Sequence, residues 1–342
     1  MKKKLIIFIP SIDDGGVEKN LFLISNYLKT NNYSVEILTC NKDKLVNFTK
    51  GINFIGSKNN FWQKRSRYVK YFVCLNILFF NLLRRVDKPL IFGFQANIYA
   101  ILVAKILNTK IITRSNSAPQ GWSYNFIKNK IYRIIIKLAD DVMVNSLDFK
   151  KSFKKKFNID AECIYNPFDK DFIKKRLLTK NKKINFFKKG YINIISIGRL
   201  VDQKDHLTSL KAIKIVNPNL KIKMVIIGKG VNKFLLEKYI KANKLNDKIK
   251  LIGYKKNPYP YLQKSNIVLL SSKYEGLPNV LLEAQYLKKY IISTNCPTGP
   301  REILLNGRAG DLVKIGDYKK IAYLINIYKK QKKTINKKIK IG

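Results

Sequence analysis

The chain has 342 residues, 46% of them apolar, which allows two domains with sizeable cores and excludes a disordered chain. It carries 68 Lys and Arg against 22 Asp and Glu, a formal charge of +46, which favours anionic partners such as nucleic acid, anionic lipid or phosphorylated substrates. Its four cysteines are scattered and its one histidine is His206, so a zinc site and a disulfide framework are disfavoured.

Short apolar runs alternate with helical stretches in the first half. Residues 5–10 predict a buried strand rather than a signal peptide, because the apolar run before Pro10 is too short for a leader. Residues 65–85 predict a long helix whose apolar part, Tyr71 to Leu83, is too short to span a bilayer. This helix is either partly buried or lies in a membrane interface. The other expected elements are helices at 15–29, 96–107 and 124–138 and strands at 34–40, 51–55, 90–94, 110–113 and 141–145.

A lysine-rich stretch, 150–189, is interpreted as the connection between two domains with a basic flank. Alternation then resumes, with strands at 191–197, 223–227, 249–252, 267–270 and 290–293 and helices at 206–216, 231–242, 258–263, 280–287 and 317–329. Such alternation predicts parallel sheets with helices on both faces. We expect an α/β protein of two doubly wound domains, 1–170 and 171–330, and a basic tail, 331–342, that is solvated or faces lipid.

Two glycines, Gly15 and Gly16, follow the first expected strand and begin the first helix. Glycine lets a ligand approach the backbone closely, and a helix N-terminus favours an anion. A plain turn explains the same pair, and the Gly-x-Gly-x-x-Gly fingerprint of nicotinamide enzymes is missing.

Two cations flank the turn after the first strand of the second half. Arg199 and Lys204 lie five residues apart, directly after Gly198. Open α/β sheets bind ligands at the carboxyl ends of their strands. A guanidinium fork and an ammonium at this place can clamp a diphosphate and stabilise it as a leaving group.

The most informative segment contains two glutamates eight residues apart, Glu275 and Glu283, in a chain with few glutamates. Glu275 falls in a loop after an expected strand, and Pro278 fits the start of the helix that carries Glu283. A carboxylate among apolar residues needs a partner, and a ribose diol is a suitable one. We expect the backbone amides of Leu277 to Val280, at the helix start, to hold donor phosphate or sugar hydroxyls.

With these motifs the second half resembles the donor domain of family 4 retaining glycosyltransferases of the GT-B fold, in which two Rossmann-like domains face each other across a cleft. The resemblance covers residues 190–315 and continues through a run at 296–302 that is similar to enzymes of bacterial surface-polysaccharide and lipid-linked oligosaccharide synthesis. The segments that carry it are Gly198-Arg199-Leu200 with Lys204, Gly228-Lys229-Gly230, Gly253-Tyr254, Glu275 with Glu283, and the run from Cys296 to Glu302 with Gly307 and Gly310. The first half is similar more loosely, through residues 15–18 and 113–116.

The resemblance implies a role for each matching residue. Arg199 and Lys204 would bind the pyrophosphate, and Glu283 the ribose hydroxyls. Glu275 would face the donor sugar near the reacting carbon, with retention of anomeric configuration. The other donor-binding residues implied are Gly16, Gly198, Gly253, Tyr254, Gly276, Leu277 and Asn279, with Gly253 and Tyr254 near the base.

The chain departs from the family on the acceptor side. Many members have a histidine in the first domain near the reacting centre, whereas His206 lies in the second. Arg114 or Asn116 is the candidate to replace it. One Asp-x-Asp pair, Asp169 and Asp171, precedes a basic helix and is interpreted as a helix cap. We expect no metal and no other cofactor, with Arg199 and Lys204 neutralising charge instead.

These observations predict a retaining hexosyltransferase. It would move a hexose or N-acetylhexosamine from a nucleotide diphosphate sugar, a uridine diphosphate sugar by resemblance, to a lipid-linked or polysaccharide acceptor. The basic surface predicts peripheral association with the anionic inner face of the cell membrane, without binding to nucleic acid. Two alternatives are a basic nucleic-acid-binding protein and a catalytically silent GT-B partner subunit; the charge alone supports the first, and the intact Glu and Arg/Lys sets argue against the second.

Overall fold

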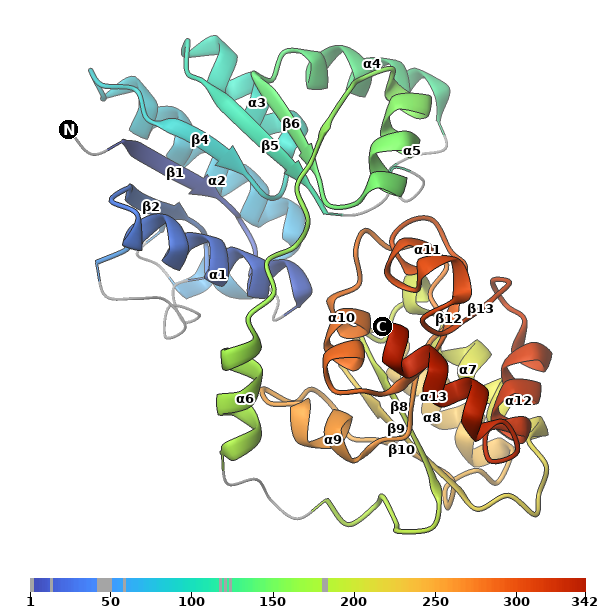
Figure 1. The fold of residues 1–342 in the computed structure, drawn as a ribbon. Coiled ribbons are helices and arrows are strands. Elements are labelled where there is room, and N and C mark those ends of the chain that lie inside the picture. Colours follow the sequence, from blue (N-terminus) through green and yellow to red (C-terminus); the bar gives the residue numbers. More distant parts are fainter. Residues whose placement is uncertain are drawn as a thin grey trace. The chain divides into compact units, whose positions relative to one another are not determined.

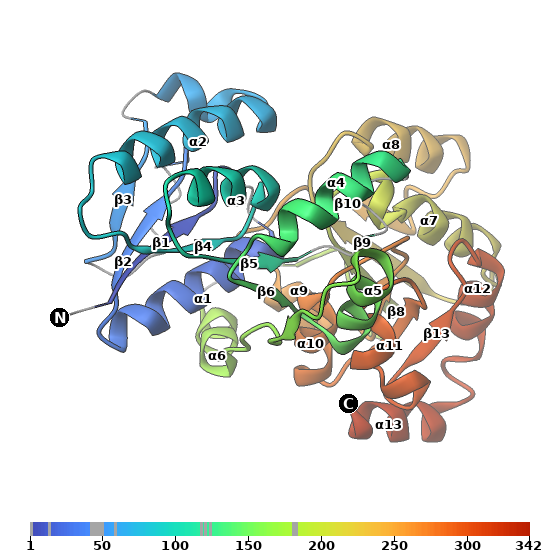
Figure 2. The ribbon, with the colours of Figure 1, turned by 90° about the horizontal axis from the view of Figure 1, so that it is seen from above.

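The computed structural model describes residues 3–12, 15–41, 51–57, 60–116, 119, 122, 125–179 and 184–342. The chain divides into two compact units, Met1–Pro167 and Phe168–Gly342. The sequence had suggested a division between residues 170 and 171. Each unit is a parallel α/β layer structure, shown from two sides in Figures 1 and 2.

The first unit contains a parallel sheet in the order β3-β2-β1-β4-β5-β6-β7. The strands are β1 (Lys4–Phe8), β2 (Ser34–Leu38), β3 (Asn53–Ile55), β4 (Leu90–Gly93), β5 (Ile111–Ser115), β6 (Asp141–Val144) and β7 (Glu162–Cys163). The helices are α1 (Gly16–Thr30), α2 (Arg67–Leu83), α3 (Asn97–Ile106), α4 (Phe126–Lys137) and α5 (Leu147–Phe157), with a 3-10 turn at Asn60–Lys64.

Strand β1 shows why both faces of this sheet are covered. Leu5 and Ile7 point into a cluster that includes Leu21 of α1. Ile6 and Phe8 point the other way, into a cluster with residues of α2 and α3. A strand buried on both faces needs a continuous apolar run, which is what the sequence has here. The first apolar run is therefore a strand of the sheet, as predicted.

The second unit has a parallel sheet in the order β10-β9-β8-β11-β12-β13. Its strands are β8 (Ile192–Ile197), β9 (Ile222–Ile227), β10 (Ile249–Leu251), β11 (Ile267–Leu270), β12 (Tyr290–Thr294) and β13 (Asp311–Val313). Its α-helices are α6 (Lys170–Leu178), α7 (His206–Ile215), α8 (Lys233–Ala242), α9 (Tyr259–Lys264), α10 (Asn279–Tyr286), α11 (Pro300–Ile303), α12 (Tyr318–Ile327) and α13 (Lys332–Ile341). Its described residues also include 3-10 turns at Asp202–Lys204 and Leu305–Gly307.

The interpretation of residues 150–189 as a connection was wrong for its first part. Residues 147–157 form α5, and Phe149, Phe153 and Phe157 are fully buried in the core of the first unit. Ser146 caps the start of the helix, because its Oγ accepts a hydrogen bond from the Phe149 amide at 3.1 Å. The lysines lie on the other side of the helix, so a helix of basic composition has one face of buried aromatic side chains.

The last residues are also structured, where the sequence had suggested a solvated or lipid-facing tail. Residues 332–341 form α13, whose Ile335 is buried in the core of the second unit. Lys338 Nζ lies 2.7 Å from Asp311 Oδ1, and Asp311 also accepts a hydrogen bond from the Tyr290 hydroxyl at 2.5 Å. The end of the chain is thereby fixed to β12 and β13.

Among the described residues, no helix has both the length and the apolar composition that a membrane span requires. Helix α2, the apolar one expected at 65–85, buries Cys74, Leu78 and Leu82 and exposes Phe72 and Phe80. It is therefore partly buried, with apolar side chains on its outer face as well.

Candidate active site

The candidate site lies at the carboxyl edge of the second sheet, where its strand order changes direction. The chain runs from β8 to β9 and β10 on one side, and then returns to place β11 on the other side of β8. The loops that follow β8 and β11 therefore diverge from neighbouring strand ends. Open α/β sheets bind ligands at this kind of switch point.

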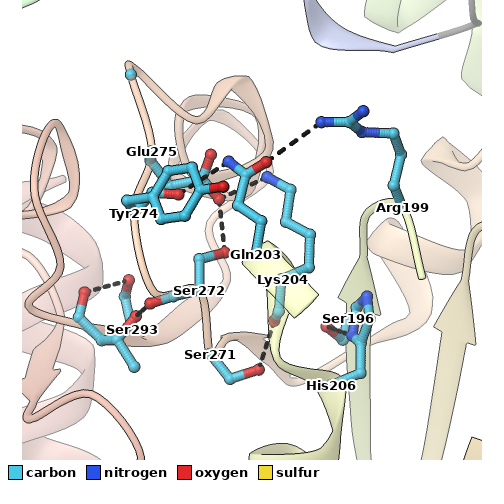
Figure 3. A network of polar contacts seen from close by, with 12 residues as sticks. Ser196, Arg199, Gln203, Lys204, His206, Ser271, Ser272, Tyr274, Glu275 and Ser293 are labelled. Atoms are coloured by element: carbon cyan, nitrogen blue, oxygen red, sulfur yellow. Dashed lines mark hydrogen bonds and ion pairs between the residues drawn. The ribbon is translucent and has the colours of Figure 1, made fainter. Parts of the chain in front are cut away.

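A buried ion pair joins these two loops (Figure 3). Lys204 Nζ lies 2.5 Å from Glu275 Oε1, with exposed side-chain fractions of 16% and 7%. The Ser272 hydroxyl donates to the same carboxylate oxygen at 2.6 Å. A buried ion pair is stable only when further hydrogen bonds satisfy its atoms, and Ser272 provides one of them.

The backbone of Glu275 is held by the loop that follows β12. Its amide donates to Pro297 O at 2.6 Å, and the Thr298 hydroxyl lies 3.1 Å from the carbonyl oxygens of Glu275 and Gly276. Gly299 approaches the same turn so closely that a Cβ there would lie 2.3 Å from Gly276 O. The position of the carboxylate is therefore set by backbone contacts on two sides.

Arg199 is linked to this network through Gln203. Its NH2 group donates to Gln203 Oε1 at 3.2 Å, and Gln203 Nε2 donates to Tyr274 O at 2.9 Å. Arg199 is exposed, and Figure 3 shows Gln203 as its contact among the side chains drawn. Arg199 and Lys204 thus belong to one cluster, in which Lys204 is paired and the guanidinium of Arg199 is accessible to an anion.

Glycines let the loops after β8, β9 and β10 approach one another. The amide of Gly228 donates to Gly253 O at 3.1 Å, and a Cβ on Gly228 would lie 1.9 Å from Gly198 O. Gly253 has a φ of +69° and faces open space. Its neighbour Tyr254 is half exposed, with Lys229 Nζ 5.2 Å from the centre of its ring.

Helix α10 carries the second glutamate. It begins at Asn279, directly after Pro278, and the preceding Leu277 is buried. Glu283 is buried too, and its Oε1 accepts a hydrogen bond from the Tyr259 hydroxyl at 3.2 Å. Burial and the nearby carboxylate raise the pKa of Tyr259, so the phenol stays a donor. Glu283 therefore has a protein partner where the sequence suggested only a ligand.

His206 lies beneath the loop that carries Arg199 and Lys204. Its Nδ1 is 3.2 Å from the Ser196 hydroxyl, and the ring is almost completely buried. Burial, with a smaller effect from Lys204, lowers the pKa of His206 to about 4. The imidazole is thus neutral at physiological pH and forms part of the support of the loop.

Three predicted residues lie in the first unit. Gly16 is the first residue of α1, and the preceding Asp13 and Asp14 lie outside the described residues. Arg114 is fully buried on β5, where its NH2 donates to Ile164 O at 3.1 Å and to Asn166 Oδ1 at 3.0 Å.

Burial lowers the pKa of Arg114 to about 10, and the guanidinium is enclosed within the unit. Asn116 follows β5, and its Nδ2 lies 3.4 Å from Phe94 O. Its Oδ1 has no hydrogen-bond partner among the described residues. Arg114 Nε also lacks a partner among the described residues, but Arg114 is fully buried, whereas Asn116 is half-buried and thus the more accessible of the two acceptor-side candidates.

The Asp-x-Asp pair is a helix cap, as predicted. Asp169 Oδ1 accepts a hydrogen bond from the Phe172 amide at 2.8 Å at the start of α6. In the parts of the chain that the structure describes, no group of three or more His, Cys, Asp or Glu side chains is arranged to hold a metal ion.

Sequence reasoning missed three polar side chains of this site: Gln203, Tyr259 and Ser272. Gln203 and Ser272 are neighbours of predicted residues in the same loops, so proximity to a strand end was the available signal. Tyr259 comes from α9, far away in sequence, and nothing in the local pattern links it to Glu283.

Comparison with known proteins gives a family for the second unit. A family model described as "Glycosyl transferases group 1" matches residues 179–342. A Campylobacter jejuni relative, an N-acetylgalactosaminyltransferase whose name gives a diphospho-undecaprenol substrate, is 26% identical over 92% of this chain and 86% of its own length. An uncharacterized glycosyltransferase of Methanocaldococcus jannaschii is 34% identical over 60% of this chain, which spans 53% of that relative.

Solved structures match over both units. An Anabaena protein, HepE, in complex with UDP-glucose has a TM-score of 0.76 at 16% identity, covering 98% of this chain and 92% of its own. TarM has a TM-score of 0.75 at 13% identity, covering 100% and 94%. The fold is accordingly GT-B, with two Rossmann-like units.

Proposed function

This chain belongs to the group 1 glycosyltransferases through residues 179–342, and we propose that it moves a hexose or N-acetylhexosamine from a uridine diphosphate sugar to a lipid-linked or polysaccharide acceptor, with retention of anomeric configuration. The observation that carries this proposal is the Lys204–Glu275 pair, held at the switch point of the sheet next to the exposed guanidinium of Arg199. It combines cations for a diphosphate with a carboxylate near them.

The donor roles follow from the chemistry of each group. Arg199 and Lys204 bind the pyrophosphate, and as the bond to the sugar breaks they stabilise the charge that develops on the leaving phosphate. Glu283 accepts hydrogen bonds from the ribose hydroxyls, since an ionised carboxylate can accept several hydrogen bonds in addition to the one from Tyr259. Tyr254 and Gly253 lie beside the base, which the open space at Gly253 supports.

Glu275 faces the donor sugar in this proposal. Its carboxylate is neutralised by Lys204 until a diphosphate competes for the ammonium, and Ser272 then keeps one of its oxygens in place. Gly276 and Leu277 precede α10 and Asn279 begins it, so all three lie by the helix N-terminus, whose dipole favours phosphate oxygens.

The proposal includes no metal and no other cofactor. Two cations, Arg199 and Lys204, supply the charge neutralisation that a divalent metal gives in other transferases. Transfer is expected to proceed in the presence of a chelator.

The acceptor and the location are proposed from the charge and from the relatives. The C. jejuni relative is named for a diphospho-undecaprenol substrate, which is anionic and membrane-bound. A chain with a formal charge of +46 is attracted to such a substrate and to anionic lipid around it. We place the enzyme peripherally at the inner face of the cell membrane, with Asn116 as the better acceptor-side candidate.

Calorimetric titration with uridine diphosphate, with and without magnesium, tests the donor site. Wild type should bind in both conditions, and Arg199→Ala and Glu283→Ala should each weaken binding by at least about tenfold, the loss of one charge-assisted contact. Lys214→Ala, which removes an exposed lysine on α7, is the matched control and should bind as wild type does.

Magnesium-dependent binding would contradict the metal-free part of the proposal. If wild type binds adenosine or guanosine diphosphate and not uridine diphosphate, the donor class is wrong while the site stands. If no nucleoside diphosphate binds, the proposed function fails.

A further inference from the structure

Helix α4 presents an apolar stripe that no other described part of the chain covers. Ile127, Ile131, Ile134 and Leu138 are spaced by four, three and four positions, so they lie on one side of the helix. Their exposed fractions are 67%, 48%, 58% and 46%. A water-exposed surface helix normally has polar residues at these positions.

The helix is anchored to the protein by its opposite face. Ile136 is buried, and Tyr132, Ile135 and Ala139 pack against the cores of the first unit. The helix therefore has two apolar faces, one packed against the unit and one exposed. The inner face fixes α4 to the unit, and the outer stripe is not needed for that packing.

A row of cations runs along one edge of the stripe. Lys130, Arg133 and Lys137 are spaced by three and four positions and are all exposed. Asp87 is the only acidic residue in the sequence between Asn60 and Ala139. An apolar stripe beside a purely cationic row is complementary to the headgroup region of an anionic bilayer, where apolar groups enter the acyl chains and cations stay at the phosphates.

The neighbouring helix extends the apolar surface. Helix α3 contacts α4 and exposes Tyr99, Leu102 and Ile106, spaced by three and four positions. Figure 2 shows α3 and α4 on the same side of the first sheet. Lys105, the cation at the edge of this surface, is paired with Asp140 at 2.7 Å, so α3 contributes mostly apolar area.

We propose that the outer face of α4, extended by α3, is a membrane-docking surface that lies in the interface of an anionic lipid bilayer. The stripe of α4 enters the acyl region, and Lys130, Arg133 and Lys137 bind lipid phosphates. The sequence had pointed to residues 65–85 for such a role, whereas α4 combines the apolar stripe with the row of cations. The inference builds on the proposed membrane-bound acceptor, but vesicle binding tests it without any transfer reaction.

Co-sedimentation with vesicles tests the docking surface. Wild type should bind vesicles that contain phosphatidylglycerol and bind much less to pure phosphatidylcholine, with binding weakened by added salt. The stripe variant Ile131→Ser/Ile134→Ser should lower the partition constant about tenfold or more, because it removes two side chains from the acyl region. Lys130→Gln/Arg133→Gln/Lys137→Gln should remove the preference for anionic lipid.

Matched variants come from α8 in the second unit. Phe234→Ser/Leu235→Ser removes two exposed apolar side chains, and Lys238→Gln/Lys241→Gln removes two exposed cations. Both should bind vesicles as wild type does. Thermal denaturation of the α4 variants checks that the chain is folded and keeps the outcome independent of the proposed function.

Depth of insertion separates docking from loose electrostatic attraction. The fluorescence of an Ile131→Trp variant should be quenched by lipids brominated on their acyl chains, beyond the quenching of the native tryptophans. The proposal is overturned if wild type does not bind anionic vesicles. That result is expected if the stripe binds a protein instead. It is also overturned if α8 and α4 variants lose binding equally.

Discussion

The ammonium of Lys204 and the carboxylate of Glu275 are 2.5 Å apart although 71 residues separate them. Their loops follow β8 and β11, which are adjacent in the sheet. The pair therefore connects the cationic and acidic parts of the proposed donor site directly. An anion that binds Lys204 changes the environment of Glu275, and this relationship leads to the first two predictions.

Glu275→Gln should separate binding from transfer. The amide keeps the shape of the side chain and can still accept from Ser272, so uridine diphosphate should bind within about threefold of wild type. Transfer to an acceptor sugar should fall by about 100-fold or more, because a charge near the reacting carbon is lost. Calorimetry and a coupled transfer assay measure the two effects. Equal loss of both would place Glu275 in the phosphate site instead.

Lys204→Met should destabilise the second unit by about 3 kcal/mol, since it leaves the buried carboxylate of Glu275 without a cation. The double variant Lys204→Met/Glu275→Gln should recover part of this loss, because no unpaired charge remains. Urea denaturation of the wild type, both single variants and the double variant gives the coupling free energy. Additive losses would mean that the pair is not coupled in solution.

His206 predicts a pH dependence of stability. Its pKa is lowered to about 4 in the fold. Between the unfolded value of about 6.5 and pH 4, the unfolded chain binds a proton that the folded chain does not. The free energy of unfolding should therefore fall by about 1.4 kcal/mol for each pH unit below 6.5 through this group. The stability that the neutral imidazole contributes is lost as the pH approaches 4.

The comparison with His206→Gln isolates that slope, because the other titrating groups are unchanged. The variant should lose less stability than wild type between pH 6.5 and pH 4.5 when urea denaturation is measured across that range. Parallel curves for the two proteins would show that the imidazole titrates normally in the fold.

Two glycines of the site should respond differently to alanine. Gly228→Ala would place a Cβ 1.9 Å from Gly198 O, so the loops after β8 and β9 must separate and uridine diphosphate binding should fall by at least about tenfold. At Gly253 an added Cβ has no clash, so Gly253→Ala should cost only the backbone strain of a φ of +69°, about 1 kcal/mol of stability. Thermal denaturation and calorimetry distinguish them. Similar behaviour of both variants would contradict the close approach at Gly228.

The sequence predicted which residues of the proposed donor site lie together, but not what these residues contact. Arg199, Lys204 and Glu275 meet in one cluster because the carboxyl ends of parallel strands share one edge, a rule that needs no side-chain detail. The pairing of Lys204 with Glu275, and of Glu283 with Tyr259, depends on packing between loops and helices that lie far apart in sequence. Local patterns carry no information on such contacts.

Helix α5 shows a different kind of failure. Phe149, Phe153 and Phe157 recur every four residues, which is a helical apolar face, but they stand among five lysines at positions 150–156. The lysine-rich composition of residues 150–189 masks the helical period of these aromatic residues. The periodicity of the aromatic residues alone would have predicted this helix and its burial.

The fixed end of the chain has a consequence for the proposed site. Lys338 of α13 contacts Asp311, which in turn accepts a hydrogen bond from Tyr290. Tyr290 begins the strand that leads into the next loop, and there the Pro297 carbonyl accepts a hydrogen bond from the Glu275 amide. A substitution that detaches α13, such as Lys338→Ala, would therefore reach the loop that holds Glu275 without touching any residue of the proposed site.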